Sequence, residues 1–140
     1  MKARKVRGLK PGEPLRANAA LIVATRLDEL RGFAEEALEP GAWNAQHEMR
    51  IAAKRLRYVL EIMAACLGPE AEHGREVAKE LQGVLGEIHD CDVMGPRAEG
   101  IESVQALLRT RRELLHARFR DLWLATEMQS ALSALEARVA

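Results

Sequence analysis

The segment 44–67 carries potentially cationic side chains at helical spacing. His47, Arg50, Lys54 and Arg57 follow one another at intervals of three and four residues, and Tyr58 adjoins the last of them. On a helix that turns about 100° per residue, these side chains share one arc. Residues three and four apart lie next to each other on a helix, so the cationic groups would stand in a column. We call these five residues the basic column.

The arc opposite the basic column is apolar and is expected to face the core. Its members are Met49, Ala52, Ala53, Leu56, Val59, Leu60 and Met63. Arg55 lies on the flank of the column, and Glu61 is the one acid in line with it. Arginine and lysine bind phosphate oxygens, and a histidine ring nitrogen can donate to them. The pattern therefore indicates a polyanion site, with a solvated face paired to acids on neighbouring helices as the alternative.

A second and weaker basic arc occurs in the segment 70–94. Arg75, Lys79, Gln82 and His89 share one side of the predicted helix, with the small Gly86 between them. The apolar positions of this segment lie on another side. The two predicted helices would thus each present a basic arc beside a separate core face.

Three further arginines stand in apolar surroundings in the sequence. Arg111 and Arg118 are seven residues apart among leucines of the segment 97–140, and Arg26 has a similar setting in the segment 14–38. A guanidinium group in an apolar arc needs a partner. These arginines could pair with carboxylates across an interface, or they could line the same anion site, and the sequence leaves both open.

Composition predicts an all-α protein with one domain. Of 140 residues, 48% are hydrophobic and only 4% are aromatic, while Ala, Leu, Glu and Arg dominate. These four are strong helix formers, and the length suits a single core. Pro40-Gly41, Gly68-Pro69 and Gly95-Pro96 divide the chain into predicted helices at 14–38, 44–67, 70–94 and 97–140. Short turns between four helices predict an antiparallel four-helix bundle.

Local signals refine these predicted helices. Pro14 suits a first helical turn, and Asn44 is expected to be the N-cap of the second helix. The predicted inward positions of the third helix are Val77, Leu81, Val84, Leu85 and Ile88. Those of the fourth helix are Val104, Leu107, Leu108, Leu114, Leu115, Phe119 and Leu122.

The basic charge of the chain is unevenly distributed. The formal net charge is zero, yet residues 1–10 contain five of the 21 Lys and Arg residues and no acid. Residues 1–13 also contain Gly8, Pro11 and Gly12, so we expect a flexible basic segment ahead of one domain at 14–140. The rest is mildly acidic, which makes nucleic acid an unexpected partner. Two cysteines, no signal-like segment and no long apolar run predict a cytoplasmic protein that does not span a membrane.

The run HEMRIAAKRLRYVLE resembles the CHAD family, the conserved histidine α-helical domains. The resemblance rests on the register of His47, Arg50, Lys54, Arg55, Arg57 and Tyr58. A second segment, LQGVLGEIHDCDVM, is similar to a later family element through Leu85, Gly86, Asp90, Asp92 and Val93. With the first predicted helix, the resemblance spans about residues 14–125, and position 89 is His where the family often has Arg.

This resemblance implies non-catalytic binding of inorganic polyphosphate in a basic channel or groove lined by the segments 44–67 and 70–94. The implied binding residues are His47, Arg50, Lys54, Arg55, Arg57, Tyr58, Arg75, Lys79 and His89, with Arg26, Arg111 and Arg118 as further candidates. Family members usually contain two related four-helix halves, whereas this chain has the length of one. We therefore expect a homodimer or pairing with a second CHAD half, in the cytoplasm and in association with polyphosphate granules.

Other functions are less well supported by the residues. His47 beside Arg50 also suits a phosphotransfer domain, and the basic arcs could make the protein a scaffold for an acidic protein or RNA. Two Glu-x-x-His strings, at Glu70–His73 and Glu113–His116, suggest a di-iron bundle, but they are interpreted as accidental. The second is expected on the side of its helix away from the interior. We expect no metal, no cofactor and no enzymatic activity, since no catalytic arrangement stands out.

Overall fold

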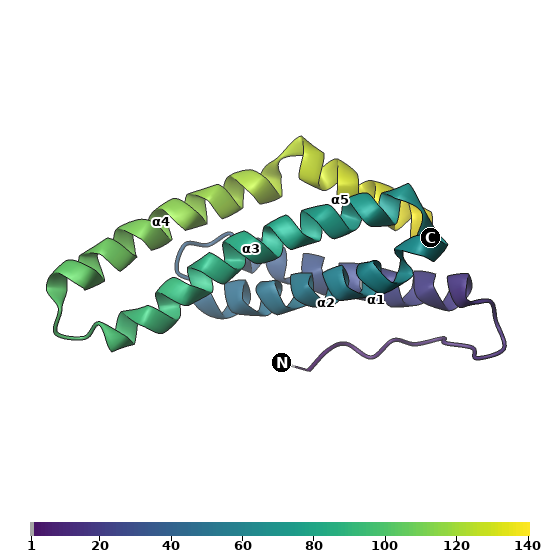
Figure 1. The fold of residues 1–140 in the computed structure, drawn as a ribbon, viewed down its shortest axis with the longest axis horizontal. Coiled ribbons are helices and arrows are strands. Elements are labelled where there is room, and N and C mark those ends of the chain that lie inside the picture. The colour runs from purple at the N-terminus through teal and green to yellow at the C-terminus, as the bar shows by residue number, and fades with distance from the viewer. Residues whose placement is uncertain (1) are drawn as a thin grey trace.

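The computed structural model describes residues 2–140, which contain five helices and no strand (Figure 1). In chain order the helices are α1 (Leu15–Ala37), α2 (Trp43–Leu67), α3 (Pro69–Arg97), α4 (Glu102–Leu124) and α5 (Thr126–Val139). α2 packs against both α1 and α3, α4 returns along α3, and α5 packs against α3 and α1. The predicted all-α class is confirmed, whereas the predicted number of helices is wrong by one.

The extra helix arises from a break that the sequence does not signal. The pattern predicts one helix over the segment 97–140, but Ala125 has an extended backbone with ψ 139° and separates α4 from α5. The side chain of Gln129 donates to the carbonyl of Trp123 over 2.6 Å and closes this corner. The break turns α5 back onto the bundle, so its apolar side is buried: Met128, Ala131, Leu132, Leu135 and Val139.

Two other predicted helix ends also differ. α2 begins at Trp43 with Ala42 as its N-cap and no capping side chain, so the prediction of Asn44 as N-cap is wrong. α3 continues through Gly95-Pro96 to Arg97. A proline in the last turn removes only one hydrogen bond, and the Ala98 N–H still bonds the carbonyls of Met94 and Gly95.

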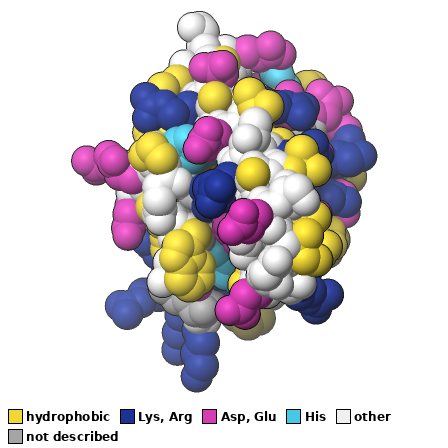
Figure 2. Space-filling view, turned by 90° about the vertical axis from the view of Figure 1, so that its left-hand side faces the viewer, with side chains coloured by type: hydrophobic (Ala, Val, Ile, Leu, Met, Phe, Trp, Pro, Cys, Tyr) yellow, Lys and Arg dark blue, Asp and Glu magenta, His cyan; other side chains and the backbone are white. Residues whose placement is uncertain are grey.

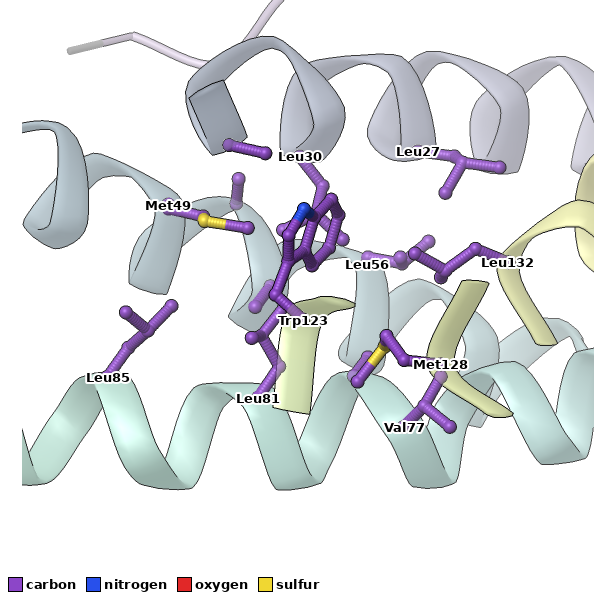
Figure 3. Packing of buried hydrophobic residues seen from close by; sticks show 14 of the residues in the cluster. Leu27, Leu30, Met49, Leu56, Val77, Leu81, Leu85, Trp123, Met128 and Leu132 are labelled. Carbon is purple, nitrogen blue, oxygen red and sulfur yellow. The ribbon is translucent and has the colours of Figure 1, made fainter. Parts of the chain in front are cut away.

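The core lies where α1, α2 and α3 meet the end of α4. Figure 3 shows Trp123 among Leu30, Met49 and Leu81, which belong to three different helices. The predicted inward positions of α3 are all buried, as are most of the apolar arc of α2: Met49, Ala52, Ala53, Leu56 and Leu60. Within the described part of the chain, no helix is long and apolar enough to cross a membrane.

The buried side of α4 agrees only in part with the predicted one: Leu115 and Phe119 are buried as predicted, but other positions are not. The sequence places Val104, Leu107 and Leu114 inward, but they are 36%, 67% and 68% exposed. The first half of α4 packs mainly against α3, so it leaves most of its surface open. The buried stripe of α4 consists of Leu115, His116, Phe119 and Trp123.

The prediction of His116 on the outward side of its helix is wrong. The residue is 6% exposed, and its Nε2 atom has no hydrogen-bond partner among the described residues. Burial lowers the pKa of His116 below the ordinary value, so a neutral ring is favoured. Glu113, its partner in the Glu-x-x-His string, is exposed.

The basic N-terminal segment lies against α1 over part of its length. The Arg4 N–H donates to Glu29 over 2.7 Å, and the Arg26 guanidinium donates to the Arg4 carbonyl over 3.0 Å. Further along, the Asn18 side chain makes two hydrogen bonds with the backbone of Lys10, at 3.0 and 2.8 Å. The sequence does not predict these contacts of residues 1–13, of which Met1 lies outside the described residues.

Glu29 is fully buried on α1 and is held by three donors. Besides the Arg4 N–H, its carboxylate accepts from Arg26 over 3.2 Å and from Arg55 over 2.9 Å. Burial on its own raises the pKa of Glu29, but the bonds from Arg4 and Arg55 outweigh this effect and lower it. The ionised form is therefore the stable one in the folded protein.

Removing this carboxylate should destabilise the fold. Glu29→Ala would leave the guanidinium groups of Arg26 and Arg55 without their buried counter-ion, which costs about 3–5 kcal/mol. Urea unfolding followed by circular dichroism measures the change. The exposed Glu36 on the same helix is the control, and Glu36→Ala should change the free energy of unfolding by less than about 0.5 kcal/mol. Equal effects of the two substitutions would contradict the role of Glu29.

Candidate functional site

The basic column stands along α2 on the side next to α3. Lys54 and Tyr58 are exposed, whereas His47, Arg50 and Arg57 are partly buried. The column takes this position because the apolar arc of α2 is occupied by α1 and the core. Lys54 Nζ and the Arg57 guanidinium lie 5.7 and 5.3 Å from the centre of the Tyr58 ring. Both cations therefore make cation–π interactions with this ring.

One surface hollow lies between the column and α3. It has a volume of about 370 Å³ and contains cations from both helices. Its lining residues are Arg50, Arg57, Lys79, Gln82, Gly83, Gly86, Glu87 and Asp90. A side chain at Gly83 or Gly86 would meet no atom within 4 Å, so the α3 side of this hollow is open. We call this hollow the α2–α3 groove.

Arg50 has an unused donor in the α2–α3 groove. Its Nε atom is buried and has no hydrogen-bond partner among the described residues. Leaving a buried donor unpaired costs about 1–3 kcal/mol, so a ligand or water that accepts from it is favoured. No ion pair joins Arg50 or Lys54 to a residue in the described range.

Arg57 is less available than its place in the sequence indicates. Its guanidinium donates to Glu61 over 2.9 Å and to Gln82 over 3.0 Å. Glu61, the one acid in line with the column, forms an ion pair with Arg57 in a partly exposed setting where such pairs contribute little. Arg50 and Lys54 are thus the two column cations without a carboxylate partner in residues 2–140.

The two histidines of the basic arcs meet across α2 and α3. His47 Nδ1 and His89 Nδ1 are 3.2 Å apart, and the rings stack with centres 4.6 Å apart. A hydrogen bond between these atoms requires that one nitrogen carries a proton and the other does not. Burial lowers the pKa of His47, and the neighbouring His89 and Arg50 lower it further. At neutral pH His47 therefore adds hydrogen-bonding capacity to the column but little charge.

The predicted basic arc of α3 is largely balanced by acids. Arg75 pairs with Glu72 over 2.6 Å. A second hollow of about 620 Å³, on the α4 side of α3, contains three cations and three carboxylates. Its charged lining residues are Arg75, Lys79, Arg118, Glu76, Glu80 and Glu87. Lys79 lines both hollows, so it is the α3 cation that the structure places beside Arg50 and Arg57.

Of the twelve predicted binding residues, three line the α2–α3 groove: Arg50, Arg57 and Lys79. His47 and His89 line a different hollow, Arg75 lines the hollow on the α4 side of α3, and Lys54 and Tyr58 stand on the column outside the groove lining.

The other four predicted binding residues lie on the α1 side or on α4. Arg55 and Arg26 bond the buried Glu29 on the α1 side. Arg111 and Arg118 are exposed on α4 and pair with Glu87 over 3.2 and 3.8 Å. The expectation that the α4 arginines occupy an apolar setting is therefore wrong, because that arc of α4 faces outward.

The sequence does not predict the two acids of the α2–α3 groove, Glu87 and Asp90. They lie on α3 at the same side as Gly83 and Gly86, where the helical wheel predicts only the basic arc. Glu87 follows Gly83 by four residues and Asp90 follows Gly86 by four, so their place beside the glycines could have been predicted from helical spacing. They lower the positive charge of the groove and so restrict which anions it can hold.

Most of the surface near the α3–α4 turn carries both charge signs, while Lys and Arg side chains gather at the lower edge of the view (Figure 2). On the rest of this face they are mixed with Asp, Glu and hydrophobic side chains. Within residues 2–140, no group of three or more His, Cys, Asp or Glu side chains is placed to hold a metal ion.

The histidine pair should make stability depend on pH. The lowered pKa means that folded His47 binds a proton less readily than unfolded His47, so the free energy of unfolding falls as pH drops below about 6.5. His47→Gln should make this dependence shallower, by at most about 1.4 kcal/mol per pH unit. Urea unfolding at several pH values measures it. The exposed His73 is the control, and a His47→Gln slope equal to that of His73→Gln would contradict the role of the pair.

Comparison with known proteins identifies a family. The sequence model of the CHAD domain matches residues 3–99, which include α1, α2 and α3. The match contains the basic column, the histidine pair and both sides of the α2–α3 groove. No curated protein and no solved structure matched the chain. Because the family model covers more than half of its residues, the chain belongs to the CHAD domain family.

Proposed function

We propose that the protein binds inorganic polyphosphate in the α2–α3 groove and does not catalyse a reaction. The CHAD family is associated with polyphosphate binding in general. The observation that carries the proposal for this chain is the Arg50 side chain, which lines the groove without an ion pair to any described residue, one helical turn from the exposed Lys54. A phosphate oxygen accepts from both types of donor, and each charge-assisted bond is worth about 1.5–3 kcal/mol.

The charges of the groove favour a chain of phosphates over a bulky polyanion. Arg50 and Lys79 line the groove and are free of ion pairs with the described residues, as is Lys54 next to it on the column, while Arg57 shares its charge with Glu61. Glu87 and Asp90 on the opposite wall repel any anion that fills the whole groove. A narrow chain can follow the α2 side and keep its distance from them. RNA or an acidic protein would bring bases or side chains toward these carboxylates.

The histidine pair favours binding over phosphotransfer. His47 Nδ1 is 3.2 Å from His89 Nδ1, and the stacked ring is partly buried. A phosphoryl acceptor needs an exposed ring nitrogen and space for a donor protein. In the proposed complex the pair lies at one end of the column and donates a hydrogen bond to a phosphate oxygen. The proposed location is the cytoplasm, where polyphosphate granules would supply the ligand.

Neutralising the column should remove binding without loss of fold. We expect the triple change Arg50→Gln, Lys54→Gln and Arg57→Gln to abolish binding of tripolyphosphate and to weaken long-chain polyphosphate by about 100-fold or more, since three charged contacts are lost. Isothermal titration calorimetry measures the affinity, and circular dichroism checks the helix content. The matched control neutralises three exposed arginines elsewhere: Arg16, Arg97 and Arg109.

The affinities of three polyanions show whether the site is specific for polyphosphate. Long-chain polyphosphate should bind more tightly than RNA or heparin, with an affinity that falls steeply as salt rises because counterions are released. Gly86→Leu adds no charge but fills the open wall of the groove, so it should weaken polyphosphate binding as well. Equal affinity for all three polymers, or unchanged binding by Gly86→Leu, would contradict a groove and favour a generic basic surface.

The exposed side of α4 supports a second proposal, that the protein pairs with a second copy of itself. Leu107 and Leu114 are seven residues apart, are exposed, and lie with Val104 along one line of the helix. Leucines at this spacing form the seam between paired helices. A pairing through α4 leaves the α2–α3 groove of each copy open.

Charge on this seam should disrupt the pair. We expect the wild-type protein to sediment as a dimer and the double change Leu107→Glu and Leu114→Glu to give a monomer, because two carboxylates would be buried without partners. Sedimentation velocity measures the mass. The control places the same charges at Leu15 and Ile62, which are exposed on other helices. A monomeric wild-type protein would contradict this pairing.

A further inference from the structure

The N-terminal segment is a concentrated positive charge outside the groove. Residues 2–10 contain Lys2, Arg4, Lys5, Arg7 and Lys10 and no acid. No ion pair joins any of these five side chains to a described residue, and all five residues are exposed. Their mutual repulsion is therefore not relieved by carboxylates within residues 2–140.

This charge is fixed in place at two points. Near one end, the Arg4 N–H bonds the buried Glu29 and the Arg4 carbonyl accepts from Arg26. Near the other end, Asn18 pairs with both backbone groups of Lys10. Arg4 thus lies beside the C-terminal half of α1, and Lys10 lies near its start. The backbone between them runs antiparallel to the helix, as Figure 1 shows.

The residue on α1 that anchors the N-terminal segment, Glu29, is buried in the protein interior. Glu29 is 0% exposed, and one of its three donors is the Arg4 backbone N–H. A buried carboxylate requires its hydrogen bonds, so releasing the segment would leave one oxygen of Glu29 with fewer partners. The fold therefore fixes, at Arg4 and Lys10, the backbone that carries several cations without ion pairs to the described residues. Cations that are already ordered lose less conformational entropy when an anion binds than cations on a free tail.

We infer that residues 2–10 form a second polyanion-binding strip, anchored on α1 by Glu29 and Asn18, which binds the same phosphate chain as the α2–α3 groove. This inference rests on the proposed function. Lys5, Arg7 and Lys10 make the phosphate contacts, and Glu29 and Asn18 are positioning residues. A long chain can engage the strip and the groove together, while a short one can engage only one of them. The strip therefore gives the protein its preference for long chains, through the high effective concentration of the second site.

The test compares two chain lengths of phosphate in the full protein and three variants of it. The strip variant carries Lys5→Gln, Arg7→Gln and Lys10→Gln. The groove variant has Arg50, Lys54 and Arg57 changed to Gln, and the control variant has Arg16, Arg97 and Arg109 changed to Gln. Calorimetry with tripolyphosphate and with long-chain polyphosphate gives the affinities at two salt concentrations.

The strip variant should bind tripolyphosphate in the groove as the wild type does. Its affinity for the long chain should fall on the order of tenfold or more, with a weaker salt dependence, because the second set of phosphate contacts is lost. Asn18→Ala keeps every charge but removes the anchor at Lys10. It should therefore lose part of the gain, meaning the higher affinity of the wild type for long-chain polyphosphate than for tripolyphosphate. An unchanged gain in that variant would contradict the positioning role of Asn18.

The outcomes separate the two proposals. Long-chain affinity of the strip variant equal to that of the control variant overturns the strip and leaves the groove intact. If the groove variant binds like the wild type while the strip variant loses binding, the groove is overturned, and so is the inference that the strip and the groove share one phosphate chain. A wild-type protein that binds neither ligand overturns both.

Discussion

The position of α2 between α1 and α3 determines the arrangement of the whole molecule. Its apolar arc contains alanines that are fully buried, Ala52 and Ala53, and small side chains let neighbouring helices approach closely. Because that arc is buried, the polar side chains of α2 lie on the two flanks of the helix, one next to α3 and the other next to α1. The basic column lies on the side of α3, and Arg55 lies on the side of α1, where it meets Glu29. α2 thus supplies one wall of the groove and, through Arg55, helps to hold the anchor of the N-terminal segment.

Much of this could be predicted from the sequence because helical periodicity is local. The core positions of α2 and α3 and the common side of the column follow from spacing alone, and the family resemblance rests on the same residues. Gly68 and Pro69 also end one helix and begin the next as expected. Periodicity determines which side chains share a face. It does not determine what stands opposite that face.

The features that were missed all depend on partners distant in the chain. Glu29 has ordinary surroundings in the sequence, and only the fold brings Arg4 and Arg55 to it from 25 and 26 residues away. The break at Ala125 has no proline or glycine, and it is favoured because it brings the apolar side of α5 onto the bundle. The apolar residues of α4 cover a wide arc, and their spacing does not tell which part meets the core. Tertiary packing buries His116 and Trp123 beside the predicted Leu115 and Phe119, and it leaves Leu107 and Leu114 exposed.

The two tryptophans occupy opposite environments, and this has an optical consequence. Trp123 is 7% exposed in the core at the end of α4, whereas Trp43 is 59% exposed at the start of α2. Trp43 also lines a hollow of about 460 Å³ together with His47 and His89. Indole emission shifts to longer wavelength in water, and a protonated imidazole quenches it on contact. The short-wavelength emission of Trp123 therefore reports on the packing of α4 and α5 against the bundle. The long-wavelength emission of Trp43 reports on the protonation of the histidine pair in the same sample.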